Sequence, residues 1–486
     1  MLSRRAVVAG GAATLAASSI ARAQTSSTGA GAVPPPTILK LERRDIEVNG
    51  RTASVYGIRQ PNGKFGLVTD VGKPFRVRVE NGIGEPSLIH WHGLTPPWRQ
   101  DGVPGISGPP IPPGGSADYD FPLRFGGMFW MHSHQGLQEQ LLMTAPLIIH
   151  DQRDRADQQE IVVMLADFSF TPPEQIFENL KKSSSMAGMA SGAPPASMAK
   201  GGAMSSMKMA KGDAAPAPDL NDVKYDAFLA NDRTLADPEV VKVEPGGRVL
   251  LRIINSSSMS NFHVDLGQLD GDLIAVDGFE VAPIRDRRFP VAVAQRLDIR
   301  LTLPPGAGAY PVLAQVEGES NQTGIVLRAG KATIVRAPLQ AETASPALTL
   351  ELERSLRAAR PLSLRKANRT HTLNLTGEMS GYVWSINNVV WNKDVPPLPV
   401  AKGERVELVL VNRTPMPHPM HFHGHEFQVV EIDGVRFSGA VRDTVLVLPR
   451  GKVVVAFDAN NPGWWALHCH LLYHLDAGMF TTIRYV

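Results

Sequence analysis

The chain of 486 residues contains one cysteine, Cys469. A single thiol cannot form an internal disulfide, so cross-links do not hold this fold together. Lys and Arg (49) nearly balance Asp and Glu (47), which leaves a formal net charge of only +2 and no long run of either sign. This balance argues against nucleic-acid binding. Beyond the N-terminal segment, no apolar stretch approaches the length of a stable membrane span.

Glycine and proline, in contrast, are plentiful. The 44 Gly and 39 Pro suit a loop-rich β architecture, and the ordinary apolar content suits a globular protein. At roughly 150 residues per domain, the length suggests about three domains.

Three segments about one domain apart share one sequence pattern. In the first, Phe75, Val77 and Val79 alternate with charged residues, as expected for a half-buried strand. The repetition predicts an all-β fold of three tandem Greek-key β-sandwich domains. The repeated segments are residues 74–81, 246–255 and 403–412. The predicted domains span residues 34–151, 160–340 and 346–486. The middle copy contains neither a cysteine nor a His-x-His pair, and we interpret this domain as a structural spacer.

Ten of the 14 histidines lie in four clusters. Successive side chains of a strand point to opposite faces, so each His-x-His pair places two imidazoles on one face. In the last cluster Cys469 points away from its two neighbours, His468 and His470. The clusters are His90 with His92, His132 with His134, His418 with His421 and His423, and His468 with His470 and His474.

These residue types indicate copper. A thiolate, an imidazole and a weak axial thioether are the ligands of a blue-copper centre, and Cys469, His474 and Met479 can supply them on one side of the strand. By parity His418 joins this site, although Pro419 interrupts regular geometry. The other eight imidazoles suit a cluster of about three metals with open positions. One cysteine and ten histidines would overfill a single tetrahedral zinc site.

The segments HWHG, HSH, HPMHFHGH and HCHLLYHLDAGM resemble the four copper-binding signatures of the multicopper oxidases, the laccase-like family, in the family's order. The resemblance implies three cupredoxin-like domains and four copper ions: one type 1, one type 2 and two type 3. It places the type 1 copper on His418, Cys469, His474 and Met479, and the type 2 copper on His90 and His421. It places the type 3 pair on His92, His132, His134, His423, His468 and His470.

The resemblance also suggests how protons are handled. Asp101 matches an acid that the family places beside the trinuclear cluster; the alternative is a turn aspartate before Gly102. Some bacterial members carry a second acid directly after the type 1 histidine, where this chain has Leu475, and Asp476 is the nearest substitute. We expect Asp101 and Cys469 to be the catalytic residues, the latter for electron transfer.

The N-terminus carries an export pattern. Arg4 and Arg5 precede an apolar run, and Ala21-Arg22-Ala23 offers a cleavage site. This predicts a twin-arginine signal peptide over residues 1–23, recognised by the Tat export machinery, and a periplasmic destination. A Sec signal or a plain anchor is the alternative, although the apolar run is short for a membrane span.

Residues 183–218 have an unusual composition of Ala, Gly, Ser, Pro and Lys, with no aromatic residue. The segment lacks the apolar content needed to offset its ordering entropy, which predicts a flexible insertion in the second domain. Thioethers select Cu(I), and Met-rich insertions occur in family members linked to bacterial copper tolerance. The alternative is a low-complexity segment in which methionine is incidental. The candidate Cu(I)-recruiting residues are Met186, Met189, Met198, Met204, Met207 and Met209.

We therefore expect a periplasmic multicopper oxidase that couples one-electron oxidation of its substrate to the reduction of dioxygen to water. Cu(I) is the preferred reductant, which would make the enzyme a copper-detoxifying cuprous oxidase. A general laccase acting on phenols or aromatic amines and a ferroxidase are the enzymatic alternatives. A copper-binding or cell-envelope scaffold protein with the same fold is the non-enzymatic alternative. The sequence carries no signal for the oligomeric state.

Overall fold

The computed structural model describes residues 35–190 and 220–486. It divides the chain into Met1–Pro36 and Thr37–Val486, and the second unit contains every helix and strand discussed below. The predicted signal peptide and Met198, Met204, Met207 and Met209 lie outside the described residues.

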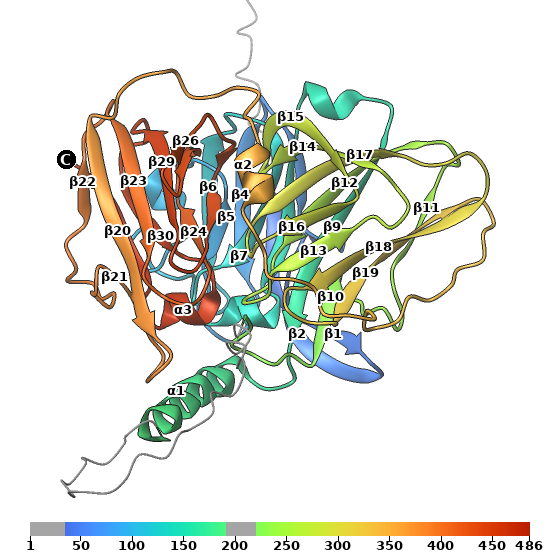
Figure 1. The fold of residues 1–486 in the computed structure, drawn as a ribbon, viewed down its shortest axis with the longest axis horizontal. Coiled ribbons are helices and arrows are strands. Elements are labelled where there is room, and N and C mark those ends of the chain that lie inside the picture. Colours follow the sequence, from blue (N-terminus) through green and yellow to red (C-terminus); the bar gives the residue numbers. More distant parts are fainter. Residues whose placement is uncertain (1–34, 191–219) are drawn as a thin grey trace, which may run out of the picture. The chain divides into compact units, whose positions relative to one another are not determined.

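The first sandwich consists of two four-stranded sheets (Figure 1). One sheet has the order β2-β1-β4-β6 and the other β3-β8-β7-β5. The strands are β1 (Thr37–Val48), β2 (Arg51–Arg59), β3 (Leu67–Asp70), β4 (Pro74–Asn81), β5 (Ile89–His92), β6 (Ser116–Pro122), β7 (Gly127–Ser133) and β8 (Thr144–His150). Three short 3-10 helices accompany them: η1 (Trp98–Gln100), η2 (Gln138–Leu141) and η3 (Gln152–Arg155).

The second sandwich pairs a six-stranded sheet, β10-β9-β12-β17-β14-β15, with a five-stranded sheet, β11-β19-β18-β13-β16. The strands of the first of these sheets are β9 (Gln159–Phe168), β10 (Ala227–Ala230), β12 (Arg248–Asn255), β14 (Gly271–Val276), β15 (Phe279–Asp286) and β17 (Arg296–Thr302). Those of the second are β11 (Val240–Val243), β13 (Phe262–Asp265), β16 (Arg288–Val291), β18 (Gly308–Val316) and β19 (Gln322–Ala329).

The third sandwich pairs the sheet β21-β20-β23-β29-β25-β26, to which β27 is added beside β25, with the sheet β22-β31-β30-β24-β28. The first sheet contains β20 (Arg369–Glu378), β21 (Val383–Ile386), β23 (Arg405–Asn412), β25 (Phe427–Ile432), β26 (Val435–Arg436), β27 (Val441–Arg442) and β29 (Lys452–Asp458). The second contains β22 (Leu398–Val400), β24 (His418–Phe422), β28 (Thr444–Val447), β30 (Trp464–Cys469) and β31 (Phe480–Tyr485). The prediction of an all-β chain with three tandem sandwiches is confirmed.

The repeated sequence pattern corresponds to one structural position in each sandwich. Strands β4, β12 and β23 each pair in parallel with one neighbour and antiparallel with the other. Each ends in a buried asparagine: Asn81, Asn255 or Asn412. Its side-chain amide donates to two backbone carbonyls, while its oxygen accepts from the backbone N–H two residues on. The repeat therefore encodes a hydrogen-bonded corner that fixes where the chain leaves each of these three strands.

The three sandwiches share buried surface. One apolar cluster runs through the second and third domains and includes Met128 and Trp130 of β7 in the first. A separate cluster fills the first sandwich. This shared burial packs β7 of the first sandwich against β12 and β17 of the second.

Helices are few: α1 (Pro173–Ala190), α2 (Glu351–Ser355) and α3 (Leu472–Asp476). Residues 183–190 of the predicted insertion form the last part of α1, and residues 191–218 lie outside the described residues. Ala, Met and Lys favour a helix, and the apolar face of its first turns is anchored, so the helix extends into the Ala-rich sequence. The buried face consists of Ile176, Phe177 and Leu180. Among the described residues, no helix combines the length and apolar character needed to cross a bilayer.

Gly102 allows the loop after η1 to lie against β5. Its φ is +85°, and an added Cβ would fall 1.9 Å from the carbonyl oxygen of Ile89. We expect Gly102→Ala to destabilise the protein by about 2–4 kcal/mol through strain and overpacking. Gly105 is the matched control: its φ is +73°, but nothing lies within 4 Å of the added carbon. Chemical denaturation of both variants tests this, and an equal loss in both would contradict the role of close packing.

Candidate metal centre

Strand pairing brings the predicted clusters together within each outer domain. On β5 and β7, His90 lies opposite His132. On β24 and β30, His421 lies opposite His468, and Met420 lies opposite Cys469. The histidine clusters of the first and third domains then meet across the domain interface, where the Nε2 atoms of His90 and His421 are 3.4 Å apart.

Cys469, His418 and His474 form one compact group, which we call the Cys469 group. Cys469 Sγ lies 3.6 Å from His418 Nδ1 and 3.9 Å from His474 Nδ1, and the two nitrogens are 3.2 Å apart. Met479 is fully buried, and its carbonyl accepts from the Cys469 N–H. The indole of Trp384 stacks on His474 with ring centroids 3.9 Å apart.

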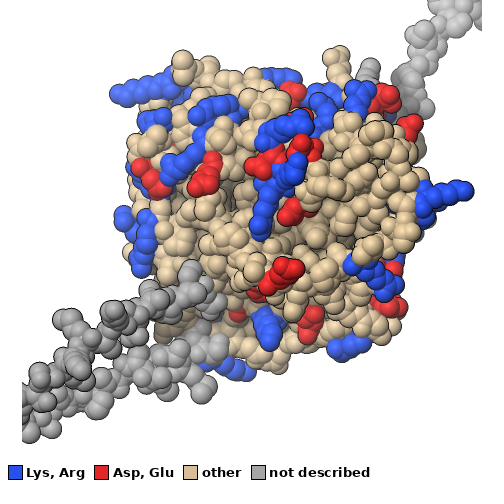
Figure 2. Space-filling model, turned by 45° about the vertical axis from the view of Figure 1, so that its right-hand side comes forward, with Lys and Arg blue, Asp and Glu red and all other residues tan. Residues whose placement is uncertain are grey.

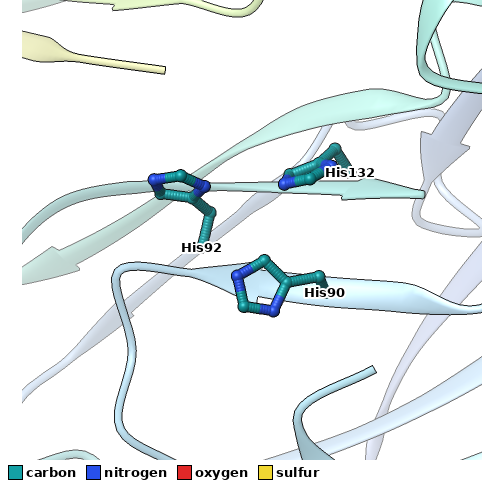
Figure 3. A group of neighbouring side chains, drawn as sticks. All are labelled: His90, His92 and His132. Carbon is teal, nitrogen blue, oxygen red and sulfur yellow. The ribbon is translucent and has the colours of Figure 1, made fainter. Parts of the chain in front are cut away.

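We describe the other eight clustered histidines as three sets, which adjoin one another: His90 also lies near His92 and His132, and near His423. The His421 pair consists of His90 and His421, described above. In the His468 group, His468 Nε2 lies 2.9 Å from His423 Nε2 and 3.3 Å from His134 Nε2. In the His470 group, one buried ring nitrogen of each residue lacks a hydrogen-bond partner, and these atoms are His92 Nδ1, His132 Nε2 and His470 Nε2. Figure 3 shows His92 and His132 approaching each other from β5 and β7, with His90 beside them.

Burial keeps seven of these imidazoles neutral. Desolvation lowers the pKa of His468 to about 3. It also lowers the pKa well below the usual range in His92, His134, His418, His421, His423 and His470. Burial raises the pKa of the Cys469 thiol. A neutral imidazole offers one lone pair, which is the form that binds a metal, whereas the thiol must lose its proton on binding.

Oxygen atoms hold the opposite nitrogens of several rings. Asp101 accepts from His423 Nδ1 (2.8 Å) through its carboxylate and from His90 Nδ1 (2.8 Å) through its backbone carbonyl. A carboxylate oxygen of Glu139 lies 2.8 Å from His132 Nδ1. Each contact places the proton on the outer nitrogen, so the inner nitrogen is left with its lone pair.

Asp443 and Asp222 complete this set of contacts. Asp443 accepts from His92 Nε2 (3.0 Å) and, through its carbonyl, from His421 Nδ1 (2.8 Å). Asp222 accepts from His474 Nε2 (2.9 Å). The sequence prediction missed Glu139, Asp443, Asp222 and Trp384. No local pattern could identify the last three, because each lies far along the chain from the histidine it contacts; Glu139 follows His134 closely but without ligand spacing.

Known proteins share the sequence features that form this centre. Family models described as multicopper oxidase match residues 24–154, 159–335 and 365–486. A multicopper oxidase of Mycobacterium tuberculosis, MmcO, is 30% identical over 86% of this chain and 80% of its own. The chain belongs to the multicopper oxidase family. Membership of this family makes the protein an oxidoreductase and implies that it binds copper.

Other relatives agree. Copper resistance protein A of Pseudomonas syringae pv. tomato is 27% identical to the oxidase over 99% of both chains. The crystal structure of Fet3p, described as a multicopper oxidase that functions in iron import, has a TM-score of 0.74 at 19% identity and covers 92% of this chain and 90% of its own. This last likeness supports the predicted cupredoxin-like fold.

The residues present fit copper. A buried thiol beside two imidazole nitrogens is a soft donor set suited to Cu(I) and Cu(II). The unpartnered nitrogens of the His470 group and the facing Nε2 atoms of the other sets would be costly to bury without a common partner. Metal ions supply that partner without disturbing the outer hydrogen bonds.

One further expectation concerned Asp476 as the substitute for an acid at position 475. A small cavity of about 10 Å³ is lined by histidines of the His468 and His470 groups together with Leu472, Leu475 and Glu139. Glu139, rather than the predicted Asp476, is the carboxylate at this cavity. Burial raises the pKa of Asp476, and nearby Lys181 of α1 opposes this shift. Asp476 does not line this cavity, and its role as a substitute for an acid at position 475 stays a prediction.

Acid should destabilise the copper-free oxidase. Burial lowers the pKa of His425, which is outside the predicted ligands, to about 4. Because the unfolded value is about 6.5, this contribution to stability is complete above that pH and is lost as the pH falls toward the folded value. We expect His425 to contribute a decrease of about 2 kcal/mol in the free energy of unfolding between about pH 7 and 5, and the other histidines with lowered pKa to act in the same direction.

Urea denaturation of the copper-free chain across this pH range measures the slope. His425→Gln removes one titrating group, so it should reduce the slope without abolishing it. A free energy of unfolding that does not change with pH would contradict the assignment of neutral buried imidazoles.

Proposed function

We propose that the four sets of residues bind four copper ions. The Cys469 group with Met479 would hold a type 1 copper, and the His421 pair a type 2 copper. The His468 and His470 groups would each hold one copper of a type 3 pair. Support comes from the number of facing nitrogens, which gives two, three and three imidazoles to the three histidine sets.

When bound, copper would supply one-electron redox chemistry at Cys469 and dioxygen reduction among the histidines. His468 and His470 flank Cys469 directly in the chain, so a few covalent bonds join the Cys469 group to both type 3 groups. Asp101 would handle protons, because its buried carboxylate contacts His423 and one of its oxygens lacks a hydrogen-bond partner.

The reductant that the geometry favours is Cu(I). Four Cu(I) ions, four protons and one dioxygen would give four Cu(II) ions and two water molecules. We propose this reaction as the physiological one, in the periplasm after export by the twin-arginine route. The relatives named copper resistance protein A agree with a role in copper tolerance.

Asp222 carries the argument for a cationic reductant. Its side chain is 1% exposed and lies between His474 Nε2 and the hydroxyl of Tyr382, which donates to it at 2.6 Å. Its other carboxylate oxygen has no hydrogen-bond partner. A buried carboxylate in contact with a ligand of the Cys469 group favours approach of a cation over a neutral phenol.

No broad field on the surface makes this choice. On the face drawn in Figure 2, acidic and basic side chains are interspersed, often side by side. With a formal net charge of +2, long-range attraction of a cation is weak. The preference for a cation would therefore arise locally, at Asp222.

The methionine-rich segment, residues 183–218, favours Cu(I) over Fe(II) as the reductant. It begins inside α1, at residue 183, and the first turns of α1 pack beside α3, the helix that carries His474: Phe177 stacks on Tyr473 with ring centroids 5.9 Å apart. The described chain resumes at Leu220, two residues before Asp222. Both described flanks of the segment thus lie near the Cys469 group, and thioethers bind Cu(I) in preference to the harder Fe(II).

Conversion of the six methionines to leucine tests this proposal. The change keeps length, apolarity and helix propensity but removes the thioethers. We expect dioxygen uptake with buffered, low Cu(I) to fall about tenfold, a loss of about 1.4 kcal/mol in transition-state stabilisation. The six positions are Met186, Met189, Met198, Met204, Met207 and Met209.

Uptake with a simple phenol and with Fe(II) provides the controls and should change less than about twofold. If the phenol is the better substrate of the wild type and the leucine variant behaves identically, the protein is a general laccase. If Fe(II) dominates in both, it is a ferroxidase. Full copper loading without any uptake would support the scaffold alternative.

Asp222→Asn provides a second test of the donor side. The amide keeps the shape of the carboxylate but removes its charge, so kcat/KM for Cu(I) should fall about tenfold and that for a phenol much less. Asp226→Asn is the control, because Asp226 contacts Ser169 and Phe170 rather than His474. Equal losses for both reductants would show that Asp222 only supports the Cys469 group.

A further inference from the structure

The middle domain contributes no residue to the four sets, yet it reaches them. Its one histidine, His263, contacts the carbonyl of Pro346. Arg296, the first residue of β17, is completely buried. Its guanidinium binds both carboxylate oxygens of Asp443 in the third domain, at 2.7 and 2.5 Å. It also donates to the carbonyl of Met128 on β7 in the first domain, at 3.4 Å. One side chain thus joins all three domains.

Asp443, which Arg296 binds, contacts histidines of two different sets. The Asp443 carboxylate accepts from His92 Nε2, and its carbonyl accepts from His421 Nδ1. The first contact leaves the lone pair of His92 on Nδ1, the atom without a hydrogen-bond partner. The second leaves the lone pair of His421 on Nε2, which faces His90. Asp443 therefore selects the inward-facing nitrogen in two different histidine sets.

Arg296 keeps Asp443 in this position by charge and by geometry. A buried carboxylate without a cation would be costly, and a planar guanidinium is the donor that holds both of its oxygens at once. The Asp277 carbonyl, also in the middle domain, accepts from Arg296 at 3.0 Å. Gln295, the preceding residue, donates to the carbonyl of Thr444 at 3.2 Å. Arg296 is therefore held by its own domain as well as by Asp443.

We propose that Arg296 is a positioning residue of the copper cluster: through Asp443 it presets His92 and His421, so the middle domain is part of the site. The inference rests on the proposed assignment of those two histidines to type 3 and type 2 copper. It does not depend on which reductant the enzyme uses. The Cys469 group lies outside these contacts and serves as an internal reference.

Arg296→Lys and Arg296→Gln test the proposal. Lysine keeps the charge but cannot bind both oxygens in one plane, and glutamine removes the charge. We expect both variants to keep the visible absorption of the type 1 site within about a fifth of the wild-type value. The near-ultraviolet absorption of the type 3 pair and the type 2 EPR signal should weaken, more in the glutamine variant. Copper bound per chain should fall toward about one ion in that variant, with dioxygen reduction at least about tenfold slower.

Arg252→Lys is the matched control. Arg252 is also buried, on the neighbouring strand β12, and pairs with Glu160 and Asp298 of the middle domain and with Asp154 of η3, which precedes that domain. Its conversion to lysine should leave every copper signal unchanged even if stability falls. Wild-type protein that lacks the type 1 and type 3 signatures would contradict the proposed copper sites before any variant is compared.

Folded Arg296 variants with wild-type type 2 and type 3 signals would overturn the inference. Parallel loss of the type 1 signal, or failure of both variants to fold while Arg252→Lys folds, would also overturn it. In those cases Arg296 would hold the fold as a whole rather than the histidines.

Discussion

Imidazoles can crowd around a common space only if each carries its proton on the nitrogen that points away from that space. In this chain burial lowers the pKa of most of the clustered histidines, so each keeps a single proton. Oxygen atoms outside the cluster then determine which nitrogen bears it. Asp101, Glu139, Asp443 and Asp222 perform this task for histidines of every set. Affinity for metal is therefore built into the surroundings as much as into the histidines.

The fold serves this constraint through repetition. Three strands ending in Asn81, Asn255 and Asn412 give each sandwich the same hydrogen-bonded corner. The first and third sandwiches contribute histidines from the paired strands β5 and β7, and β24 and β30. The middle sandwich contributes none of the clustered histidines but has the same corner, and its residue Arg296 binds Asp443, which contacts two of those histidines. The same sandwich architecture thus presents the clustered histidines in the first and third domains and supports them in the second.

Periodicity and spacing predicted much of the fold and the centre. Alternation along a strand correctly separated Cys469 from its neighbours, and the parity argument placed His418 with it despite Pro419. The three repeats predicted three sandwiches. Asp443 and Asp222 were missed because their contacts with His92 and His474 arise from packing between domains. Asp443, for example, lies 351 positions from His92, and no local pattern records such a distance. The helical start of the insertion was missed because anchoring of Phe177 extends a helix that composition alone does not predict.

The depth of the centre has a consequence for maturation. Nearly all of the clustered histidines are at most 2% exposed, and the cavity among them has room for about one water molecule. The first and third domains close over it from opposite sides. A hydrated metal ion cannot pass such walls without a local opening of this seam. If copper binds as proposed, its acquisition would be a gated step in the history of each molecule, and the bound ions would help to hold the seam closed.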